Sequence, residues 1–443
     1  MSKVDLVPRQ PPALDPNEDR YWDPRDLEVE MRRVLEICHG CRMCVGYCGT
    51  FPSVFARIDR DIEERAATGA ELLDDAGFAE ASDLCWQCKL CYVKCPYTQD
   101  EGHAWLVDVP RLLTREKAQR ARRNGISIQD RVLGEPQLLG RVTAGPLAPI
   151  ANLVNANRLV RKAMEKAAGI AAAFPLPPFG SQSFPAWLAN HRPDTQAGTR
   201  GTVALFATCL ADYNFPSIAV AAVRVLEKNG WRVVRPQQTC CGMPNLDGGD
   251  IDAAREKARA NVASLLREVE AGHKLVCLQP TCAYTARREW PELLGTEDAR
   301  KVATAMLDVM ELLDQQRRDK TLSRAFSSGL GRVAYHAACH LRAQKIGYPA
   351  VRLLDLLPDT EVEIVEQCSA VDGTWGMKAQ HYEMGRRYAQ KMARGVEAVE
   401  PALVVTDCAL SARRILAENG RAAVHPIEAL AKAYGWNAGG AAT

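Results

Sequence analysis

Half of the sixteen cysteines in this 443-residue chain lie in two short runs with the same spacing. Both runs, "CHGCRMCVGYC" and "CWQCKLCYVKC", follow the pattern C-x2-C-x2-C-x3-C. Three thiolates at this spacing let one tight turn bind three corners of a cubane cluster, and the fourth, set apart, ligates the other cluster in two-cluster ferredoxins. The pattern therefore predicts two 4Fe–4S clusters with crossed ligands. The first would bind Cys38, Cys41, Cys44 and Cys95, and the second would bind Cys48, Cys85, Cys88 and Cys91.

The surroundings of these cysteines argue against disulfide bonds and against structural zinc. The N-terminal stretch has no apolar segment of the kind that directs secretion. The most apolar run, at 167–179, is too short and too interrupted by proline to cross a bilayer. We therefore expect a cytoplasmic protein, in which thiols stay reduced. Zinc sites usually separate two C-x2-C pairs by a longer loop than these runs contain, so iron–sulfur ligation is favoured.

Composition and the positions of the cysteines divide the chain into five parts. The sequence predicts a mobile N-terminal segment at 1–25, a helical ferredoxin domain at 26–125, a helical and proline-rich connector at 126–198, and two α/β units at 199–328 and 329–443. The ferredoxin domain is expected to be helical because the stretch between the two cysteine runs lacks strand patterns. A formal net charge of +2 is too small to favour a nucleic acid as the main partner.

The last two parts repeat one another. "GTVALFATC" at 201–209 matches "GRVAYHAAC" at 331–339, and "KLVCLQPTCAYTARR" at 274–288 matches "ALVVTDCALSARR" at 402–414. In each copy, strand-like runs alternate with amphipathic helical patterns, which predicts a largely parallel sheet with helices between its strands. The expected fold class is therefore α + α/β, an all-α domain followed by two small α/β units. The repeated cysteines follow predicted strands, so we expect them at the carboxyl edge of each sheet.

Each repeat places its own set of thiols at that edge. The paired cysteines of "CCGMP" can face one site only through a turn, because neighbouring strand residues point to opposite faces, and Gly242 and Pro244 favour such a turn. Cys277 aligns with Leu403 of the second copy, which predicts a buried strand residue. The first unit contributes Cys209, Cys240, Cys241 and Cys282, and the second contributes Cys339, Cys368 and Cys408.

Two ferredoxin runs followed by two "CCG"-type repeats resemble the C subunits of anaerobic glycerol-3-phosphate dehydrogenases over about residues 30–435. The stretches "YHAACHLRAQKIGYPAVRLLDLLP", "DGTWGMK" and "VVTDC" are the most similar. The arrangement is also similar to the iron–sulfur subunits of glycolate and lactate oxidation and to the C and D subunits of heterodisulfide reductase. The resemblance implies that each repeat carries Cys, then Cys-Cys-Gly, then Cys-x-x-Cys. This chain departs from that pattern at Thr285, Ser369, Ala370 and Ser411.

These departures reduce the number of thiols in each unit. The first unit keeps four, which favours a plain 4Fe–4S cluster over the noncubane cluster that the family's five thiolates imply. The second unit keeps three, which leaves open a cluster with one non-cysteine ligand, a zinc ion, or no metal. His336 and His340 are the nearest other candidate ligands.

The chain lacks the sequence signatures of a protein that binds a nucleotide cofactor. It has no G-x-G-x-x-G after a predicted strand, no Walker loop, and no recognisable set of catalytic residues. We therefore predict a non-catalytic subunit that relays single electrons between a separate flavin-dependent dehydrogenase and an acceptor. The family resemblance implies the quinone pool as that acceptor, with contact at the inner face of the cell membrane. Two alternatives stay open: a thiol–disulfide reductase of the heterodisulfide reductase type, and a zinc-stabilised interaction module.

Two further stretches carry weaker signals. The basic helical stretch at 111–125 is interpreted as a solvated helix face, in preference to a surface for an anionic membrane or an acidic partner. The more apolar stretch at 153–174 is expected either to bridge domains or to present a hydrophobic docking patch.

Overall fold

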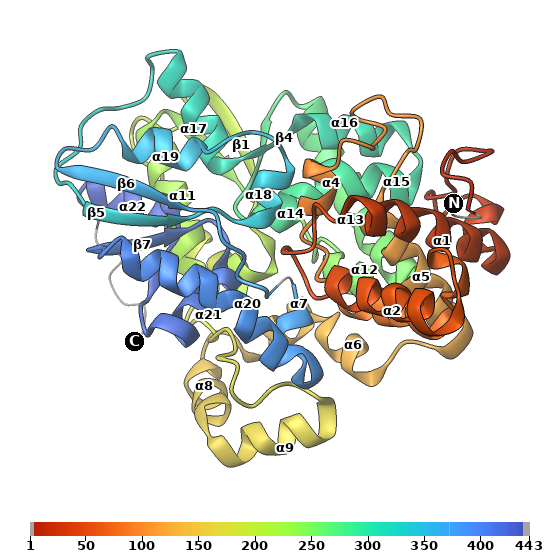
Figure 1. Cartoon of the computed structure of the whole chain (residues 1–443). Helices are drawn as coiled ribbons and strands as arrows, with labels where there is room; N and C mark the ends of the chain where they lie inside the picture. Colours follow the sequence, from red (N-terminus) through yellow and green to blue (C-terminus); the bar gives the residue numbers. More distant parts are fainter. Residues whose placement is uncertain (1–3, 372, 437–443) are drawn as a thin grey trace.

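The computed structural model describes residues 4–371 and 373–436. An all-helical N-terminal part, a helical connector and two parallel four-stranded sheets follow one another along the chain (Figure 1). Within the described ranges, no helix is both long and apolar enough to cross a bilayer. The mixture of helices and parallel sheets is the one that the sequence predicts.

Short helices surround the first eight cysteines. Helix α1 begins where Asp23 accepts a hydrogen bond from the backbone N–H of Arg25, and it ends before Arg42, whose φ of 52° is left-handed. Cys38 and Cys41 therefore lie on the last turns of a helix rather than in a tight turn. The elements of this part are η1 (Asp19–Trp22), α1 (Pro24–Cys41), α2 (Thr50–Arg65), η2 (Ala70–Leu72), α3 (Asp75–Asp83), α4 (Leu90–Lys94) and α5 (Val109–Asn124).

The second cysteine run does form a tight loop. Gln87 and Lys89 stand on either side of Cys88 with φ angles of 46° and 64°, a conformation that costs free energy for residues other than glycine. The chain then enters α4, which carries Cys91. The strained loop folds the backbone back on itself, so that the thiols of Cys85, Cys88 and Cys91 face one cavity.

Helix α5 is buried, so the interpretation of its basic sequence as a solvated face is wrong. Leu112 and Leu113 are in the core, and Arg115 is fully buried. The Arg115 guanidinium donates hydrogen bonds to the backbone carbonyls of Tyr21 and Arg20, at 2.7 Å each. Contrary to the expectation of a mobile lead-in, the chain around Tyr21 is therefore packed against α5, where Tyr21 is 2% exposed.

The connector is a series of short helices, two of which form a lobe. Helices α8 and α9 lie below the rest of the molecule in Figure 1, joined to it by a short turn before α8 and by a longer segment largely without helix or strand after α9. The connector contains α6 (Ile128–Leu133), α7 (Pro136–Thr143), α8 (Ala148–Ala156), α9 (Arg158–Ala168) and α10 (Phe184–Leu188).

The two C-terminal units have the same topology. The first sheet has the strand order β2-β1-β3-β4 and the second has β6-β5-β7-β8, with every neighbouring pair parallel. The first unit contains β1 (Gly201–Phe206), η3 (Leu210–Asn214), α11 (Pro216–Lys228), β2 (Trp231–Val234), α12 (Met243–Asp247), α13 (Ile251–Glu270), β3 (Lys274–Cys277), α14 (Pro280–Tyr284), η4 (Thr285–Glu289), α15 (Trp290–Leu294), α16 (Glu297–Ala305), β4 (Met306–Asp308) and α17 (Val309–Arg318). The second contains β5 (Gly331–His336), α18 (Cys339–Ala343), α19 (Pro349–Leu354), β6 (Thr360–Val365), η5 (Trp375–Met377), α20 (Ala379–Ala398), β7 (Leu403–Thr406), α21 (Ala409–Asn419), β8 (Ala423–Val424) and α22 (Pro426–Ala433).

The two units share one hydrophobic core. Helix α11 of the first unit packs against α22 of the second, and α17 of the first packs against α19 of the second. Val203 and Leu205 of β1 and Val333 and Tyr335 of β5 belong to the same buried cluster. The final helix of each unit thus packs against a helix of the other. Most of the cysteines at the carboxyl edges of the two sheets lie beside the helical N-terminal part.

Candidate functional site

The first predicted thiol set lines one small cavity. Cys38, Cys41 and Cys44 reach it from the end of α1 and the following loop, and Cys95 reaches it from the end of α4. The rest of its wall is largely apolar, with Phe55 among the side chains that line it. The structure therefore brings together the four cysteines that the crossed assignment groups, although Cys95 lies in the other run.

The second predicted set lines a second small cavity. Its thiols are those of Cys48, Cys85, Cys88 and Cys91. Phe51 lines both cavities, so they are neighbours separated by an aromatic side chain.

Electrostatics shows how close the two sets are. Burial raises the pKa of the Cys91 thiol, and the charges of Cys85 and Cys48 in its own set add to that increase. Cys44 and Cys38 of the first set raise the pKa of Cys91 further, which places them within electrostatic reach of the second cavity.

The donor chemistry of both cavities fits an iron–sulfur cluster. Burial raises the pKa of Cys38, Cys85 and Cys88, and neighbouring thiolates raise it further, so four charged sulfurs together need a compensating cation. Cluster iron provides that charge, and a coordinating thiol loses its proton outright. Backbone N–H groups already point at the sulfurs, as the N–H of Gln87 does toward Cys85 Sγ at 3.4 Å.

A third set of thiols lies at the carboxyl edge of the first sheet. Cys209 follows β1, Cys240 and Cys241 follow β2, and Cys282 lies on α14 after β3, and all four are buried. Hydrogen bonds from Cys209 and Cys241 lower the pKa of Cys240, while Cys241 also has a hydrogen bond with Cys282. The four sulfurs thus form a continuous chain of contacts.

The turn that brings Cys240 and Cys241 to this site depends on glycine. Gly242 has a φ of +93°, and a Cβ atom there would lie 3.2 Å from the backbone oxygen of Ala254. Pro244 follows in the first turn of α12. The predicted turn is present, with the residues that the sequence indicated.

The polar residues that hold this turn in place were not identified by any sequence motif. The Gln137 side chain, from the connector helix α7, accepts a hydrogen bond from the backbone N–H of Cys240 at 2.7 Å. Asn261 donates to the carbonyl oxygen of Cys240 at 3.1 Å, and the Trp290 indole donates to that of Cys241 at 2.9 Å. These residues come from three separate helices and follow no motif, so only the tertiary structure identifies them.

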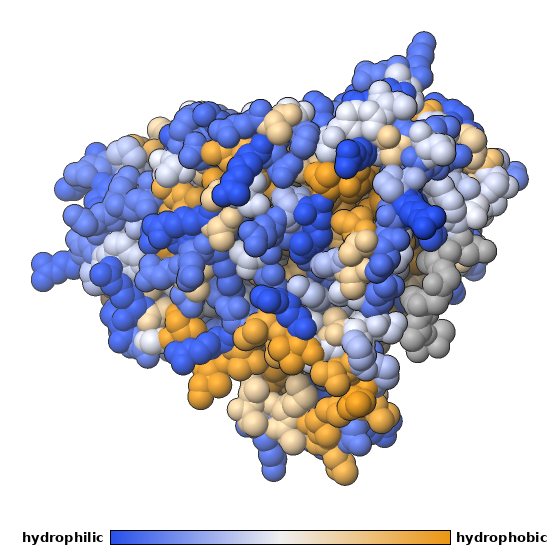
Figure 2. Space-filling model, turned by 180° about the vertical axis from the view of Figure 1, so that it is seen from behind, coloured by the Kyte–Doolittle hydropathy of each residue, from blue (hydrophilic) through white to orange (hydrophobic). Residues whose placement is uncertain are grey.

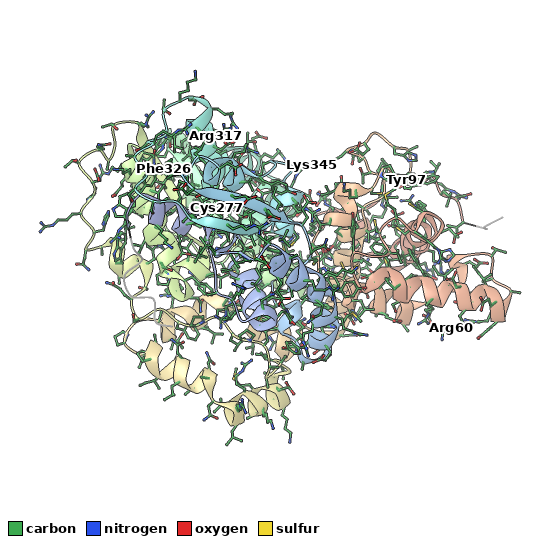
Figure 3. All side chains as sticks on the ribbon, turned by 60° about the vertical axis from the view of Figure 1, so that its left-hand side comes forward. Arg60, Tyr97, Cys277, Arg317, Phe326 and Lys345 are labelled. Carbon is green, nitrogen blue, oxygen red and sulfur yellow. The ribbon has the colours of Figure 1, made fainter. Side chains whose placement is uncertain are left out.

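Cys277 is not part of this set, as predicted. It is the last residue of β3, it is fully buried, and its Sγ donates to the backbone oxygen of Gln279 at 3.4 Å. Figure 3 labels it within the α/β body.

Two of the three cysteines of the second unit face the ferredoxin side. Cys339 and Cys368 pack against the apolar cluster that contains Cys48 and Cys88. Burial raises the pKa of Cys88, and the next largest contributions come from the charges of Cys368 and Cys339. Cys408, the third predicted ligand, packs instead against the core that the two CCG units share.

Two residues at which this unit departs from the family pattern, Ser369 and Ser411, form a hydrogen bond with each other. The hydroxyls of Ser369 and Ser411 are 2.9 Å apart and buried. Cys408 precedes α21, and its sulfur accepts a hydrogen bond from the backbone N–H of Ser411 at 3.5 Å. Two hydroxyls thus occupy the places of two thiols.

The two histidines considered as further ligands have other partners, so that interpretation is wrong. His336 contacts the hydroxyl of Thr406 through Nδ1 and the carbonyl oxygen of Gln367 through Nε2, at 3.0 Å each. Burial lowers the pKa of His336 to about 4, which keeps its ring neutral.

His340 is held in the same way. Its Nδ1 lies 2.9 Å from the hydroxyl of Thr281, and its Nε2 lies 3.0 Å from the carbonyl oxygen of Gln87. Both ring nitrogens are used, and the histidine links the second unit to the loop beside Cys88. Over 4–371 and 373–436, no three His, Cys, Asp or Glu side chains are close enough together to bind a single metal ion.

Known families and proteins resemble this chain over most of the parts just described. The family described as "Citrate utilization protein B Fer4-like domain" matches residues 31–123, and the "Cysteine-rich domain" (CCG) family matches residues 203–287 and 333–410. The C subunit of the anaerobic glycerol-3-phosphate dehydrogenase of Escherichia coli K12 is 29% identical over 315 residues, which cover 69% of this chain and 77% of that protein.

Two archaeal proteins match shorter regions. The D subunit of the dihydromethanophenazine:CoB–CoM heterodisulfide reductase of Methanosarcina mazei is 25% identical over 239 residues, covering 51% of this chain and 56% of its own. The B subunit of the fumarate reductase (CoM/CoB) of Methanothermobacter marburgensis is 27% identical over 209 residues, covering 46% and 40%. The chain therefore contains a Fer4-like domain and two CCG domains, and it is homologous to the C subunit of anaerobic glycerol-3-phosphate dehydrogenase and related to the D subunit of heterodisulfide reductase.

Proposed function

We propose that this chain relays single electrons between a separate flavoprotein dehydrogenase and an acceptor, with the quinone pool as that acceptor. The observation that carries the proposal is the juxtaposition of sulfur sites. The two four-thiol cavities are neighbours across Phe51, and Cys339 and Cys368 stand against the second of them. One-electron carriers held in such a series are what an electron-transfer protein needs.

In this proposal the first eight cysteines hold two 4Fe–4S clusters in the crossed arrangement, and the first CCG unit holds a third through Cys209, Cys240, Cys241 and Cys282. When bound, such clusters accept and release one electron each. The protein would tune their reduction potentials through burial and through N–H groups directed at sulfur, such as that of Gln87.

The second CCG unit would extend this series. Its three cysteines, Cys339, Cys368 and Cys408, would contribute to a further cluster, with the Ser369–Ser411 pair nearby. A single zinc ion is not favoured there, because no three possible ligands of the described residues are close enough together to bind one. The position of Cys339 and Cys368 against Cys88 favours a redox role over a purely structural one, because an isolated structural ion would not need to face another thiol-lined cavity. Contact with the inner face of the cell membrane, where quinones dissolve, would complete the path.

Metal analysis of the full chain, purified without oxygen, tests the proposal. Taking four irons per cubane, we expect about 8 iron atoms per chain from the two ferredoxin sets and about 12 if the first CCG unit is also loaded. Dithionite should produce a paramagnetic signal. Because the two cavities adjoin, that signal should show two interacting spins, and the Cys95→Ser variant, which disrupts the first set alone, should lose the interaction. Zinc with little iron, or a colourless protein, would contradict the proposal.

One substitution distinguishes the thiol–disulfide reductase alternative from the electron relay. Cys339→Ser alters the second unit while leaving both ferredoxin sets intact. Loss of substrate turnover by the assembled complex, with unchanged metal content and unchanged reduction of every cluster by dithionite, would place catalysis at that cysteine instead of relay. Unchanged turnover would leave the relay as the better description.

A further inference from the structure

The α8–α9 lobe carries an open pocket of ≈ 490 Å³ that belongs to none of the thiol sites. Its wall includes four basic side chains. Arg158, Arg161 and Lys162 come from α9, and Arg413 comes from α21 of the second CCG unit. The lobe lies between the regions that the two family descriptions match, so neither family accounts for it.

The positive charge in this pocket is not balanced by the protein. Across the described ranges, none of these four side chains is within salt-bridge distance of a carboxylate. Arg161 is 5% exposed, yet its guanidinium donates only to neutral groups, among them the carbonyl oxygens of Ala171 at 2.6 Å and Phe174 at 2.8 Å.

Burial lowers the pKa of two arginines of the pocket, Arg161 and Arg413. For Arg161 burial is opposed by one acid, Glu165, and for Arg413 burial is the only cause of the lower pKa. The Glu165 carboxylate itself accepts the backbone N–H of Ala172 at 2.6 Å. Buried charges in proteins are normally paired, so an excess of cations around one cavity indicates an anion that binds there.

The two helices that line this cationic pocket also expose apolar side chains to solvent. Ile150 and Leu153 of α8 are 63% and 74% exposed, and Leu159 of α9 is 78% exposed. Figure 2, seen from behind, shows the apolar surface concentrated on this lobe, with hydrophilic side chains next to it. Exposed apolar residues next to basic ones are typical of segments that lie in the interface of an anionic membrane.

We propose that this lobe docks on a phospholipid bilayer and that the pocket binds the phosphate of an anionic lipid headgroup. Charge complementarity selects the ligand, since four cations and one acid face the pocket region, and the exposed leucines and isoleucine would enter the acyl boundary beside it. The inference rests on the membrane contact proposed above and names the lipid chemistry responsible for it. It does not depend on the number of clusters.

Flotation of the full, cluster-loaded chain with vesicles tests the inference. One set of vesicles contains phosphatidylglycerol and phosphatidylcholine, and the other contains phosphatidylcholine alone. We expect binding to the anionic vesicles that weakens as salt rises, and much weaker binding to the neutral ones. The Arg158→Gln/Lys162→Gln variant changes only two exposed pocket residues. It should bind anionic vesicles roughly 25-fold more weakly, since each basic residue near such a surface contributes roughly fivefold.

The control variant removes two positive charges from exposed residues outside the pocket. Arg60, on the outer side of α2 (Figure 3), and Arg192, after α10, are exposed arginines. Arg60→Gln/Arg192→Gln should bind like the wild type, and Arg413→Gln should repeat the loss from the other side of the pocket. Leu153→Gln/Leu159→Gln should lose binding to both kinds of vesicle.

Three outcomes would overturn the inference. They are equal loss in the pocket and control variants, equal binding to neutral and anionic vesicles, and binding of inorganic phosphate in the pocket with no binding to vesicles. Iron content is measured in every variant, so that failure of lipid binding with intact clusters is distinguished from failure of the proposed electron transfer.

Discussion

At the scale of single residues, burial alone does not distinguish a candidate ligand from a core cysteine. Cys241 and Cys277 are both buried in the first CCG unit. Cys241 has hydrogen bonds with Cys240 and Cys282, whereas the Cys277 thiol donates to a backbone oxygen. The difference lies in whether the thiol faces other thiols.

Two substitutions should therefore have different effects on iron content. We expect Cys241→Ala to remove about four irons per chain, one cubane, because the first CCG unit loses a ligand. Cys277→Ala should leave the iron content unchanged and cost only some packing stability. Iron analysis of both variants after anaerobic purification provides the check. Equal iron in the two proteins would argue against a cluster in that unit.

His425 shows how a buried histidine affects stability rather than metal binding. Its Nδ1 accepts from the backbone N–H of Ile427 at 3.1 Å, and its Nε2 lies 3.0 Å from the carbonyl oxygen of Leu278. Burial lowers the pKa of His425 from 6.5 to about 3. The unfolded chain therefore binds a proton at this residue more readily than the folded chain between these two values.

The sign of the pH effect follows from that difference. The contribution of His425 is complete above pH 6.5 and declines as the pH falls toward 3, at about 1.4 kcal/mol per pH unit for one proton. We expect His425→Asn, which can still cap α22, to lose less unfolding free energy than the wild type between pH 6.5 and 5. Anaerobic denaturation at several pH values measures this, and parallel profiles would contradict it.

At the scale of elements, the turn after β2 decides where two thiols point. A residue with a side chain at position 242 would have to adopt a left-handed conformation and also approach the carbonyl of Ala254. Gly272 has a similar φ of +78° but has nothing within 4 Å of an added Cβ. Comparing alanine substitutions at Gly242 and Gly272 therefore distinguishes the cost of a left-handed backbone from the cost of a steric clash.

We expect Gly242→Ala to be more damaging than Gly272→Ala. Both should lose about 1 kcal/mol of unfolding free energy from the left-handed backbone. Only Gly242→Ala should also lower the iron content, because the turn that carries Cys240 and Cys241 must shift. Thermal melting and iron analysis measure the two effects, and unchanged iron in Gly242→Ala would show that the turn tolerates the shift.

At the scale of the whole molecule, a buried ion pair joins the ferredoxin part to the first CCG unit. Lys89 Nζ lies 3.0 Å from Glu289 Oε1, with Lys89 buried and Glu289 largely so. Burial opposes the charged form of Lys89, but Glu289, Tyr284 and Asp247 together outweigh it and raise the pKa of Lys89. Breaking such a pair leaves one buried charge without its partner.

Glu289→Gln should therefore lower the unfolding free energy by about 3 kcal/mol. The exposed pair between Glu297 and Arg300 provides the control, and Glu297→Gln should have no measurable effect. Hydrogen exchange should also increase in the loop around Cys88, since Lys89 is part of it. Equal stability of the two variants would indicate that the modules are held together by other contacts.

The sharing of one core between the two CCG units gives a physical reason for keeping a second repeat with fewer thiols. Helix α11 needs α22, and α19 needs α17, so deleting either unit would expose the other's apolar face. The second unit also supplies Cys339 and Cys368 to the ferredoxin side. Its structural role is therefore clear whatever its metal content.

Much of this arrangement follows from the sequence alone, because periodicity and cysteine spacing are local. Strand and helix patterns predicted the repeated parallel sheets, "CCGMP" predicted the turn at Gly242, and the alignment of Cys277 with Leu403 predicted a core residue. The crossed thiol sets were also proposed from spacing, and which sulfurs iron binds stays a prediction.

Only the tertiary structure decided which faces of these elements meet. A basic pattern at 111–125 does not reveal that Arg115 will be surrounded by backbone carbonyls from a distant segment. Gln137 reaches the Cys240 turn from more than a hundred residues away, and His340 is bound to Gln87 across two modules. Such contacts depend on the packing of segments that are far apart in the sequence. This packing determines which side chains are buried and which charges are paired, and it produces no periodic pattern in the sequence.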